Sequence, residues 1–486
     1  MSMTNGTGKL NGAGHDPAPA RPAATHDAVA PLSDEERIAA LEEFFSAADQ
    51  REKFIPVTRE ALTDRLTQTG AWPPGVAADA RRFFSYLNQW RQQSYGAKLL
   101  ELSRLYEPFS PDSDLLVTRR FSSGERAQLE RGLVEGICEL LQQANFTRID
   151  PSMVELILTK DSAYGLDLHV DLDAFDELEI WYRGISSSLH QRRSLKKLYL
   201  KKEEFDVPIF RRLAIVFKLK SEERRIKELM QKEGLDWRKA ERKVRKMRGL
   251  VSDLIKTENV YIKLFKNIPR ADLEMCFPNT RIKFRLLDKI RLGVSAGGGL
   301  GMGVAGTVSK LAVATNPIAL AGAVAGLGGI AIRQIISFTN QRNKYMVTMA
   351  QNLYSHALAD NHGVLSLLAE RAAEEDFKEE VLLYALLAKE AVRIDQIKEA
   401  DEAIERFLGQ TFGIDVNFDV LDALKRLQRD GIVTMSSDGV LRTLPPADAM
   451  ARIDELWDRY LDDLPDIAAV EGYEFDGDFS AVGAVT

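Results

Sequence analysis

Cysteine and histidine are scarce in this 486-residue chain, and the common catalytic motifs are missing. The two cysteines, Cys138 and Cys276, form no CxxC pair, which argues against a disulfide framework and a thiolate metal site. The six histidines have no HExxH or other paired-ligand spacing, and the sequence contains no serine nucleophile elbow and no phosphate-binding loop. We interpret the polar cluster of His169, Asp171 and Asp173 as an exposed acidic loop, in preference to a weak divalent-cation site. We therefore expect no catalytic residue, no metal ligand and no cofactor.

One long stretch of the sequence lacks charge. From Leu292 to Ile332, only Lys310 is charged among 41 residues, whereas 28% of the whole chain is charged. A membrane-spanning helix needs about 20 mostly apolar residues, so this stretch predicts a transmembrane helical hairpin that turns at Asn316 and Pro317. The flanking basic residues predict that both ends are cytoplasmic; they are Lys289, Arg291, Arg333, Arg342 and Lys344. A single span and a buried hairpin in a soluble core remain alternatives.

Glycine is frequent in the same stretch, with 11 residues among the 41. Six glycines form pairs four positions apart, a spacing that favours close packing of membrane helices; the pairs are Gly297 and Gly301, Gly299 and Gly303, and Gly322 and Gly326. The segment Gly301–Gly306 also matches the dinucleotide-binding fingerprint, but no acidic residue follows before Asp360 to bind a ribose. We therefore predict helix packing and not nucleotide binding.

Charge is strongly segregated along the chain. Residues 191–291 contain 30 Lys and Arg against 14 Asp and Glu, a local charge of +16 in a protein of net charge -7. A basic block beside a membrane segment favours contact with anionic lipid headgroups. Nucleic acid is the less favoured partner, and self-association or a protein partner is a further candidate. Within this block, residues 221–257 show heptad spacing at Trp237, Val244 and Val251, which predicts a charged helical hairpin with a short coiled-coil seam.

Residues 33–290 predict an α+β module that is mostly helical and contains a small sheet. The helix signal is clear at Ala127–Gln143, and the strand signals are Leu178–Tyr182, Leu213–Leu219 and Val260–Phe265. The predicted organisation is a disordered tail (1–32), this cytoplasmic module with its insertion (33–290), the hairpin (291–338), connecting helices (339–375), a winged-helix-like module (376–446), and a helix with an acidic tail (447–486).

The winged-helix-like module is predicted from two helices followed by a two-stranded wing. The helices are Lys398–Leu408 and Phe418–Arg429, and the strands are Ile432–Met435 and Val440–Leu444. Residues 376–442 contain 9 basic and 14 acidic residues, whereas a DNA-binding module should be basic. We therefore predict a protein-contact or structural role for this module.

Several spaced motifs resemble the transmembrane-protein-143-like family, whose members have no known function. They are 51–59 (REKFIPVTR), 106–114 (YEPFSPDSD), 182–184 (YRG), 265–269 (FKNIP), 272–278 (DLEMCFP), 287–290 (LDKI), 352–354 (NLY) and 360–364 (DNHGV). The resemblance implies an integral membrane protein with eukaryotic relatives in mitochondria. It supplies no catalytic residues.

These observations predict a membrane-anchored protein of the bacterial cytoplasmic (inner) membrane, acting in the lipid bilayer as a non-enzymatic scaffold or oligomeric element. The alternatives are a small-solute pore or a membrane-bound hydrolase. An enzyme should bring titratable groups together in a pocket, which the sequence alone does not reveal.

Overall fold

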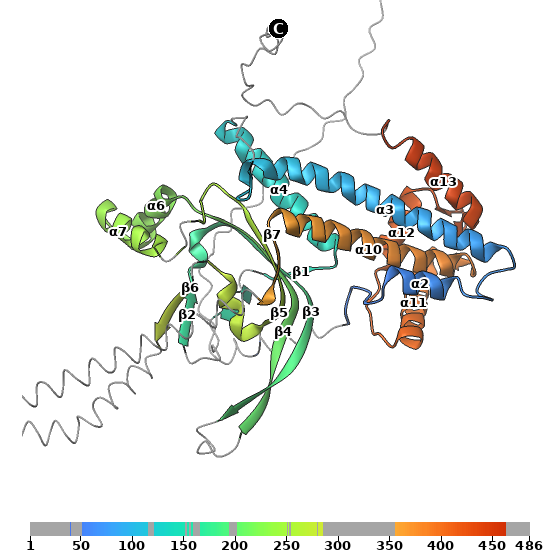
Figure 1. Ribbon diagram of the computed structural model, residues 1–486, viewed down its shortest axis with the longest axis horizontal. Coiled ribbons are helices and arrows are strands. Elements are labelled where there is room, and N and C mark those ends of the chain that lie inside the picture. Colours follow the sequence, from blue (N-terminus) through green and yellow to red (C-terminus); the bar gives the residue numbers. More distant parts are fainter. Residues whose placement is uncertain are drawn as a thin grey trace, which may run out of the picture.

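A computed structural model describes residues 51–114, 121–150, 166–193, 202–249, 254–278, 280–284 and 355–462, and the separate positions 39, 153, 154, 157, 158 and 251. Its largest sheet is antiparallel, with strand order β1-β3-β4-β5-β7. The strands are β1 Thr147–Arg148, β3 Phe175–Arg193, β4 Lys202–Leu219, β5 Tyr261–Pro269 and β7 Ala357–Asp360. The long ribbon of β3 and β4 extends beyond the layer of helices (Figure 1). A second pair, β2 Leu166–Val170 and β6 Thr280–Phe284, forms its own small sheet.

Three helices lie against one face of the large sheet or beside it (Figure 1). They are α3 Val76–Tyr106, α4 Ser123–Gln143 and α10 His362–Leu387. Strand residues such as Trp181, Ala214 and Leu264 share a core with helical residues such as Ile137 and Leu368. Because residues two apart in a strand point to the same face, this core defines the helix-covered side of the sheet. The predicted helix at 127–143 is confirmed as part of α4.

The start of α10 is fixed to the sheet by one side chain. Asn361 has a positive φ of 49° and ends the short strand β7, after which the chain turns into the helix. Its Oδ1 accepts a hydrogen bond from the Ile262 backbone N–H at 3.1 Å, and its Nδ2 donates to Asp112 at 2.7 Å. These bonds join the helix start to β5 and to the segment after α3, and so set where α10 crosses the sheet.

A second lobe combines the two ends of the described chain. It contains α2 Arg59–Leu66, the first half of α3, the second half of α10, α11 Ile397–Phe412, α12 Val420–Arg429 and α13 Pro446–Asp458. A three-stranded sheet of order β8-β10-β9 completes it, with β8 Val392–Arg393, β9 Val433–Met435 and β10 Val440–Thr443. Phe83, Phe84 and Tyr384 pack at its centre, with the rings of Phe83 and Tyr384 4.6 Å apart.

The predicted charged hairpin is formed by α6 Glu222–Glu233 and α7 Trp237–Arg248. Ala240 and Val244 of α7 pack on Ile226 and Leu229 of α6, so the seam is used within the hairpin. The helix ends at Arg248, so Val251 of the predicted heptad lies beyond it. Four 3₁₀ segments complete the described elements: Glu107–Phe109, Leu172–Ala174, Arg270–Cys276 and Ile394–Gln396.

The transmembrane part of the predicted fold is not supported. The predicted hairpin (291–338), with its turn, its glycines and the flanking basic residues, lies outside the described residues. Within the ranges that are described, no helix combines the length and apolarity needed to cross a membrane; the two longest, α3 and α10, carry many charged side chains. The fold class is therefore corrected to α+β, in which the described residues give no support to a transmembrane hairpin. The same finding overturns the predicted location in a bacterial inner membrane.

Candidate functional site

The second half of α10 buries an unusual number of charged side chains. Six of the seven residues from Glu374 to Glu380 are charged, and Glu375, Asp376, Lys378, Glu379 and Glu380 are each at most 4% exposed. Charged residues are rarely buried unless they are paired. Phe377 lies in the core between them, so α10 is enclosed on all sides at this point. The partners of these charges come from α3, α12 and the segment before α2.

Arg426 of α12 binds most of the carboxylates. Its guanidinium contacts Asp376 at 3.2 Å, Glu379 at 2.5 Å and Glu380 at 2.7 Å, and it also pairs with Asp422 one turn earlier. Asp419 caps the start of α12 by accepting a hydrogen bond from the Asp422 backbone N–H at 3.1 Å. The cap fixes the first turn of the helix, which carries Asp422 toward Arg426.

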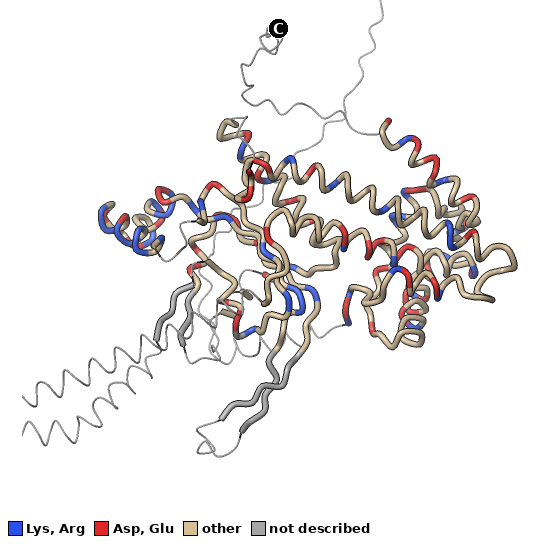
Figure 2. The backbone as a smooth tube through the Cα atoms, viewed as in Figure 1, with Lys and Arg blue, Asp and Glu red and all other residues tan. Residues whose placement is uncertain are grey.

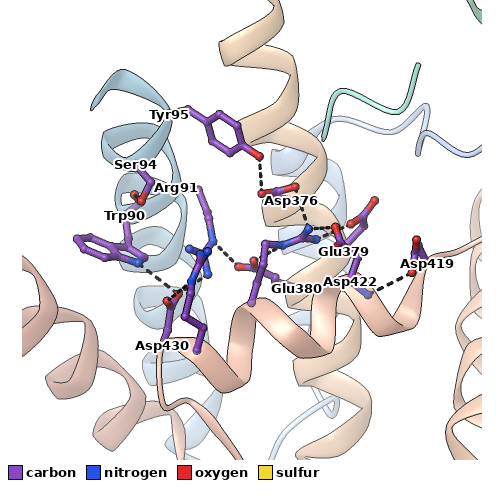
Figure 3. Close-up of polar contacts among 12 residues, drawn as sticks. Trp90, Arg91, Ser94, Tyr95, Asp376, Glu379, Glu380, Asp419, Asp422 and Asp430 are labelled. Carbon is purple, nitrogen blue, oxygen red and sulfur yellow. Dashed lines mark hydrogen bonds and ion pairs between the residues drawn. The ribbon is translucent and has the colours of Figure 1, made fainter. Parts of the chain in front are cut away.

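Arg91 of α3 links the same group to the end of α12. Its Nε donates to Glu380 at 2.8 Å, and its Nη2 bonds to Asp430. Tyr95, one turn further along α3, donates its hydroxyl to Asp376 at 2.7 Å. Figure 3 shows these side chains converging from three helices on one region. Arg91 Nη1 is buried and has no hydrogen-bond partner among the described residues.

A cavity of about 980 Å³ opens beside this cluster. Its walls come from α3, α4, α10, α12 and the segment that precedes α12. Polar side chains dominate the wall: Lys53, Arg91, Lys98, Lys425, Arg426 and Arg429 are basic, Glu139, Asp376, Glu379, Asp419 and Asp422 are acidic, and Gln142, Gln143, Asn145 and Asn417 are amides. Such a wall suits a small charged solute and not an apolar one.

The buried part of the cluster has more negative than positive charge. Four carboxylates that are at most 6% exposed (Asp376, Glu379, Glu380 and Asp430) face the guanidinium groups of Arg91 and Arg426, an excess of two, and the half-exposed Asp422 also pairs with Arg426. Burial raises the pKa of Glu379 to about 8 and that of Asp376 to about 6, because desolvation outweighs the attraction of Arg426. The cluster therefore holds protons readily near neutral pH, and another cation could replace them.

A metal ion is one candidate cation. Oxygen atoms of Asp376, Glu379 and Asp422 lie within 4.8 Å of one another, and carboxylates are the ligands that Mg²⁺ and Ca²⁺ prefer. Arg426, however, contacts all three of these carboxylates. A metal bound by all three would have to displace the guanidinium, which is 9% exposed and is also bonded to Glu380. The arrangement therefore fits a cation approaching from the cavity better than a metal at the centre.

None of the site residues predicted from the sequence contributes to this cavity, although Lys53 of the 51–59 motif and the predicted helix Phe418–Arg429 line it. The six glycines, Asn316, Pro317 and the five flanking basic residues lie outside the described residues. The proposed acidic loop serves the fold: Asp171 contacts Arg225 at 3.0 Å, and Asp173 contacts Lys232 at 3.2 Å, so both hold α6. His169 belongs to strand β2. One sequence feature does point to the cavity: the dense charge of residues 374–380 lies between apolar stretches of the same helix.

Comparison with known proteins gives one match to part of the chain and no activity. Residues 210–363 match the model of a family described as Protein of unknown function (DUF3754). The match runs from β4 to the first residues of α10, and none of the cavity-lining residues falls within it. No solved structure matches the chain. The match does not support a transmembrane-protein-143-like family, so that resemblance is corrected.

Proposed function

We propose that this protein binds a small cationic amino compound in the cavity between α3, α4, α10 and α12. The observation that carries the proposal is the excess of buried carboxylates beside an open cavity. An ammonium group has three hydrogen-bond donors and can contact Asp376, Glu379 or Asp422 from the cavity side. It would offset the excess charge without displacing Arg426.

Arg91 adds a second requirement for the ligand. Arg91 is one of the residues that line the cavity, and its Nη1 is a buried donor without a partner among the described residues. A buried donor that lacks an acceptor typically costs about 1–3 kcal/mol. A ligand with an acceptor group, such as a carboxylate, would satisfy it. Amino acids that carry an additional amino group combine both features, so L-lysine is a suitable first probe.

Thermal unfolding in the presence of L-lysine tests the proposal directly. We expect the melting temperature to rise with L-lysine and not with NaCl at the same ionic strength. Glu379→Gln should abolish the shift in melting temperature, because a neutral amide cannot balance the ligand's positive charge. Asp422→Asn, at the half-exposed edge of the cavity, serves the same purpose if Glu379→Gln does not fold. Glu402→Gln, an exposed change on α11, is the matched control and should keep the shift.

Isothermal titration at several pH values supplies a second readout. Because burial raises the pKa of Glu379 to about 8, a cation that binds the ionised carboxylate must release a proton at neutral pH. Affinity should therefore increase as the pH rises from 6.5 to about 8.

Equal shifts of the melting temperature with L-lysine and NaCl would refute the proposal. A shift with Mg²⁺ or Ca²⁺ alone would favour a metal site instead.

A further inference from the structure

Three neighbouring strands of the large sheet carry basic residues in a single row. Arg183 of β3 lies opposite Arg212 of β4, and Arg212 lies opposite Lys266 of β5. Side chains that are directly opposite in an antiparallel sheet project to the same face with their Cβ atoms about 4.5–5.5 Å apart. Like charges in such pairs repel one another. Figure 2 shows Lys and Arg on these neighbouring strands.

The row lies on the helix-covered face of the sheet. Each of its residues is two positions from a strand residue of that core, Trp181, Ala214 or Leu264, and therefore points to the same side. Arg371 of α10 adds a further positive charge here. Burial lowers the pKa of Arg212, and the charges of Arg371 and Arg211 lower it further. The positive charges of Arg371 and Arg211 therefore repel that of Arg212.

The nearby carboxylates are already committed to other partners. Glu52 contacts Arg211 at 3.0 Å, and Glu374 contacts Arg371 at 2.7 Å. Glu375 contacts Lys378 at 2.8 Å and accepts a hydrogen bond from the Ile55 backbone N–H. In the described part of the chain, no carboxylate forms an ion pair with Arg183, Arg212 or Lys266. Positive charge therefore remains in excess along the row.

Arg183 is held in place without an ion pair among the described residues, although Glu375, Glu374 and Glu52 attract it at longer range. Its guanidinium lies over the rings of Phe54 and Phe146, at 4.7 Å and 5.2 Å from their centroids. Its Nη1 donates to the Ala144 carbonyl at 3.2 Å, whereas its buried Nε has no partner among the described residues. Aromatic rings and a carbonyl orient a guanidinium but leave its full charge available. This combination is suited to a bound anion.

We propose that Arg183, Arg212 and Lys266 bind a tetrahedral oxyanion of the phosphate type, either free phosphate or the phosphate group of a small ligand. Arg is well suited to phosphate because its planar group donates two parallel hydrogen bonds, and Lys adds a point charge. The bound anion would convert the repulsion within the row into attraction. Arg371, which is about half-exposed, adds its positive charge to that of Arg183 and Arg212.

Thermal unfolding with inorganic phosphate tests the site. We expect phosphate to raise the melting temperature by at least about 2 °C over sodium chloride of equal ionic strength. Without phosphate and at low salt, Arg212→Gln should raise the melting temperature, because it removes the central repulsive charge. The same variant should lose the response to phosphate. Lys266→Gln tests the same loss of the phosphate response if Arg212→Gln fails to fold.

Controls separate this site from a general salt effect and from the cavity. Arg82→Gln, on the exposed side of α3, should change neither the melting temperature nor the phosphate response. Glycerol 3-phosphate distinguishes the two sources: a larger shift than with inorganic phosphate assigns the site to a phosphorylated ligand, and an equal or smaller shift assigns it to free phosphate. No specific phosphate shift in the wild-type protein would overturn the proposal. So would a phosphate response that persists in both Arg212→Gln and Lys266→Gln.

Discussion

Replacing Glu380 by Gln should destabilise the fold strongly, because this fully buried carboxylate is shared by two arginines. It accepts hydrogen bonds from Arg91 Nε at 2.8 Å and from Arg426 Nε at 2.7 Å. These arginines belong to α3 and α12, so Glu380 of α10 joins three helices (Figure 3). Gln has the same shape and removes only the charge and one acceptor oxygen, so the change isolates the electrostatic contribution.

The expected loss is about 3–5 kcal/mol in the free energy of unfolding. A hydrogen bond to a charged group contributes about 1.5–3 kcal/mol, and Glu380 makes two of them. Gln can accept from one arginine through its oxygen, but its NH₂ then faces the other guanidinium. Breaking a buried ion pair by removing one partner typically costs about 3–5 kcal/mol.

Urea unfolding followed by circular dichroism and tryptophan fluorescence measures this loss. Glu402→Gln is the matched control, because its carboxylate is half-exposed and lies 3.8 Å from Arg406; it should cost less than about 0.5 kcal/mol. The two optical signals should coincide if the unfolding is two-state. A loss below about 1 kcal/mol for Glu380→Gln would show that the network does not hold the three helices together.

Four further changes probe other parts of the same reasoning. Burial raises the pKa of Glu379 from 4.5 to about 8, so the native state keeps a proton that the unfolded state releases. The free energy of unfolding should therefore fall as the pH rises from 4.5 to about 8. Urea titrations of Glu379→Gln should show a weaker fall. Gly184→Ala should destabilise by about 1–3 kcal/mol in thermal unfolding, because Gly184 has a φ of +73° and an added methyl would lie 2.8 Å from a Glu52 oxygen. Gly132→Ala, a helical position of α4 whose new methyl would lie 3.7 Å from Leu105, should instead stabilise by about 0.5–1 kcal/mol in the same assay. Ser122→Ala should cost about 1 kcal/mol in urea unfolding, because Ser122 and Glu125 form a capping box at the start of α4.

Local periodicity predicted many elements of the fold. The alternation and β-branched residues of 213–219 lie within β4, and the helix expected at 127–143 lies within α4 with Leu133, Ile137 and Leu140 buried. The helices and strands expected between 398 and 444 lie at α11, α12, β9 and β10. These signals depend on neighbours a few residues apart, and for that reason they are readable in a single sequence. The proposed protein-contact role of that region stays a prediction.

The candidate site was not predictable in the same way. Arg91 and Asp430 are 339 residues apart in sequence and meet only because α3 and α12 pack on α10. The charged run 374–380 looks like a solvated helix surface, since charged residues are mostly exposed. Its burial depends on arginines from two distant helices. The basic block 191–291 predicts contact with anionic lipid, yet two of its residues form ion pairs within the fold, Lys218 with Glu130 and Arg225 with Asp171. The predicted contact of this block with anionic lipid stays a prediction.

The charge pattern around α10 is difficult to explain by folding alone. On one side, the carboxylates of Asp376, Glu379 and Glu380 outnumber their guanidinium partners beside a cavity. Near Arg371, five basic groups (Arg183, Arg211, Arg212, Lys266 and Arg371 itself) outnumber the three carboxylates of Glu52, Glu374 and Glu375. A structural ion network gains most when its charges balance, and replacing buried ion pairs with apolar residues is often neutral or stabilising. Two unbalanced groups of opposite sign, both close to one buried helix, therefore reduce stability in the absence of ligands. They are consistent with a helix that holds one site for a cationic ligand and another for an anion.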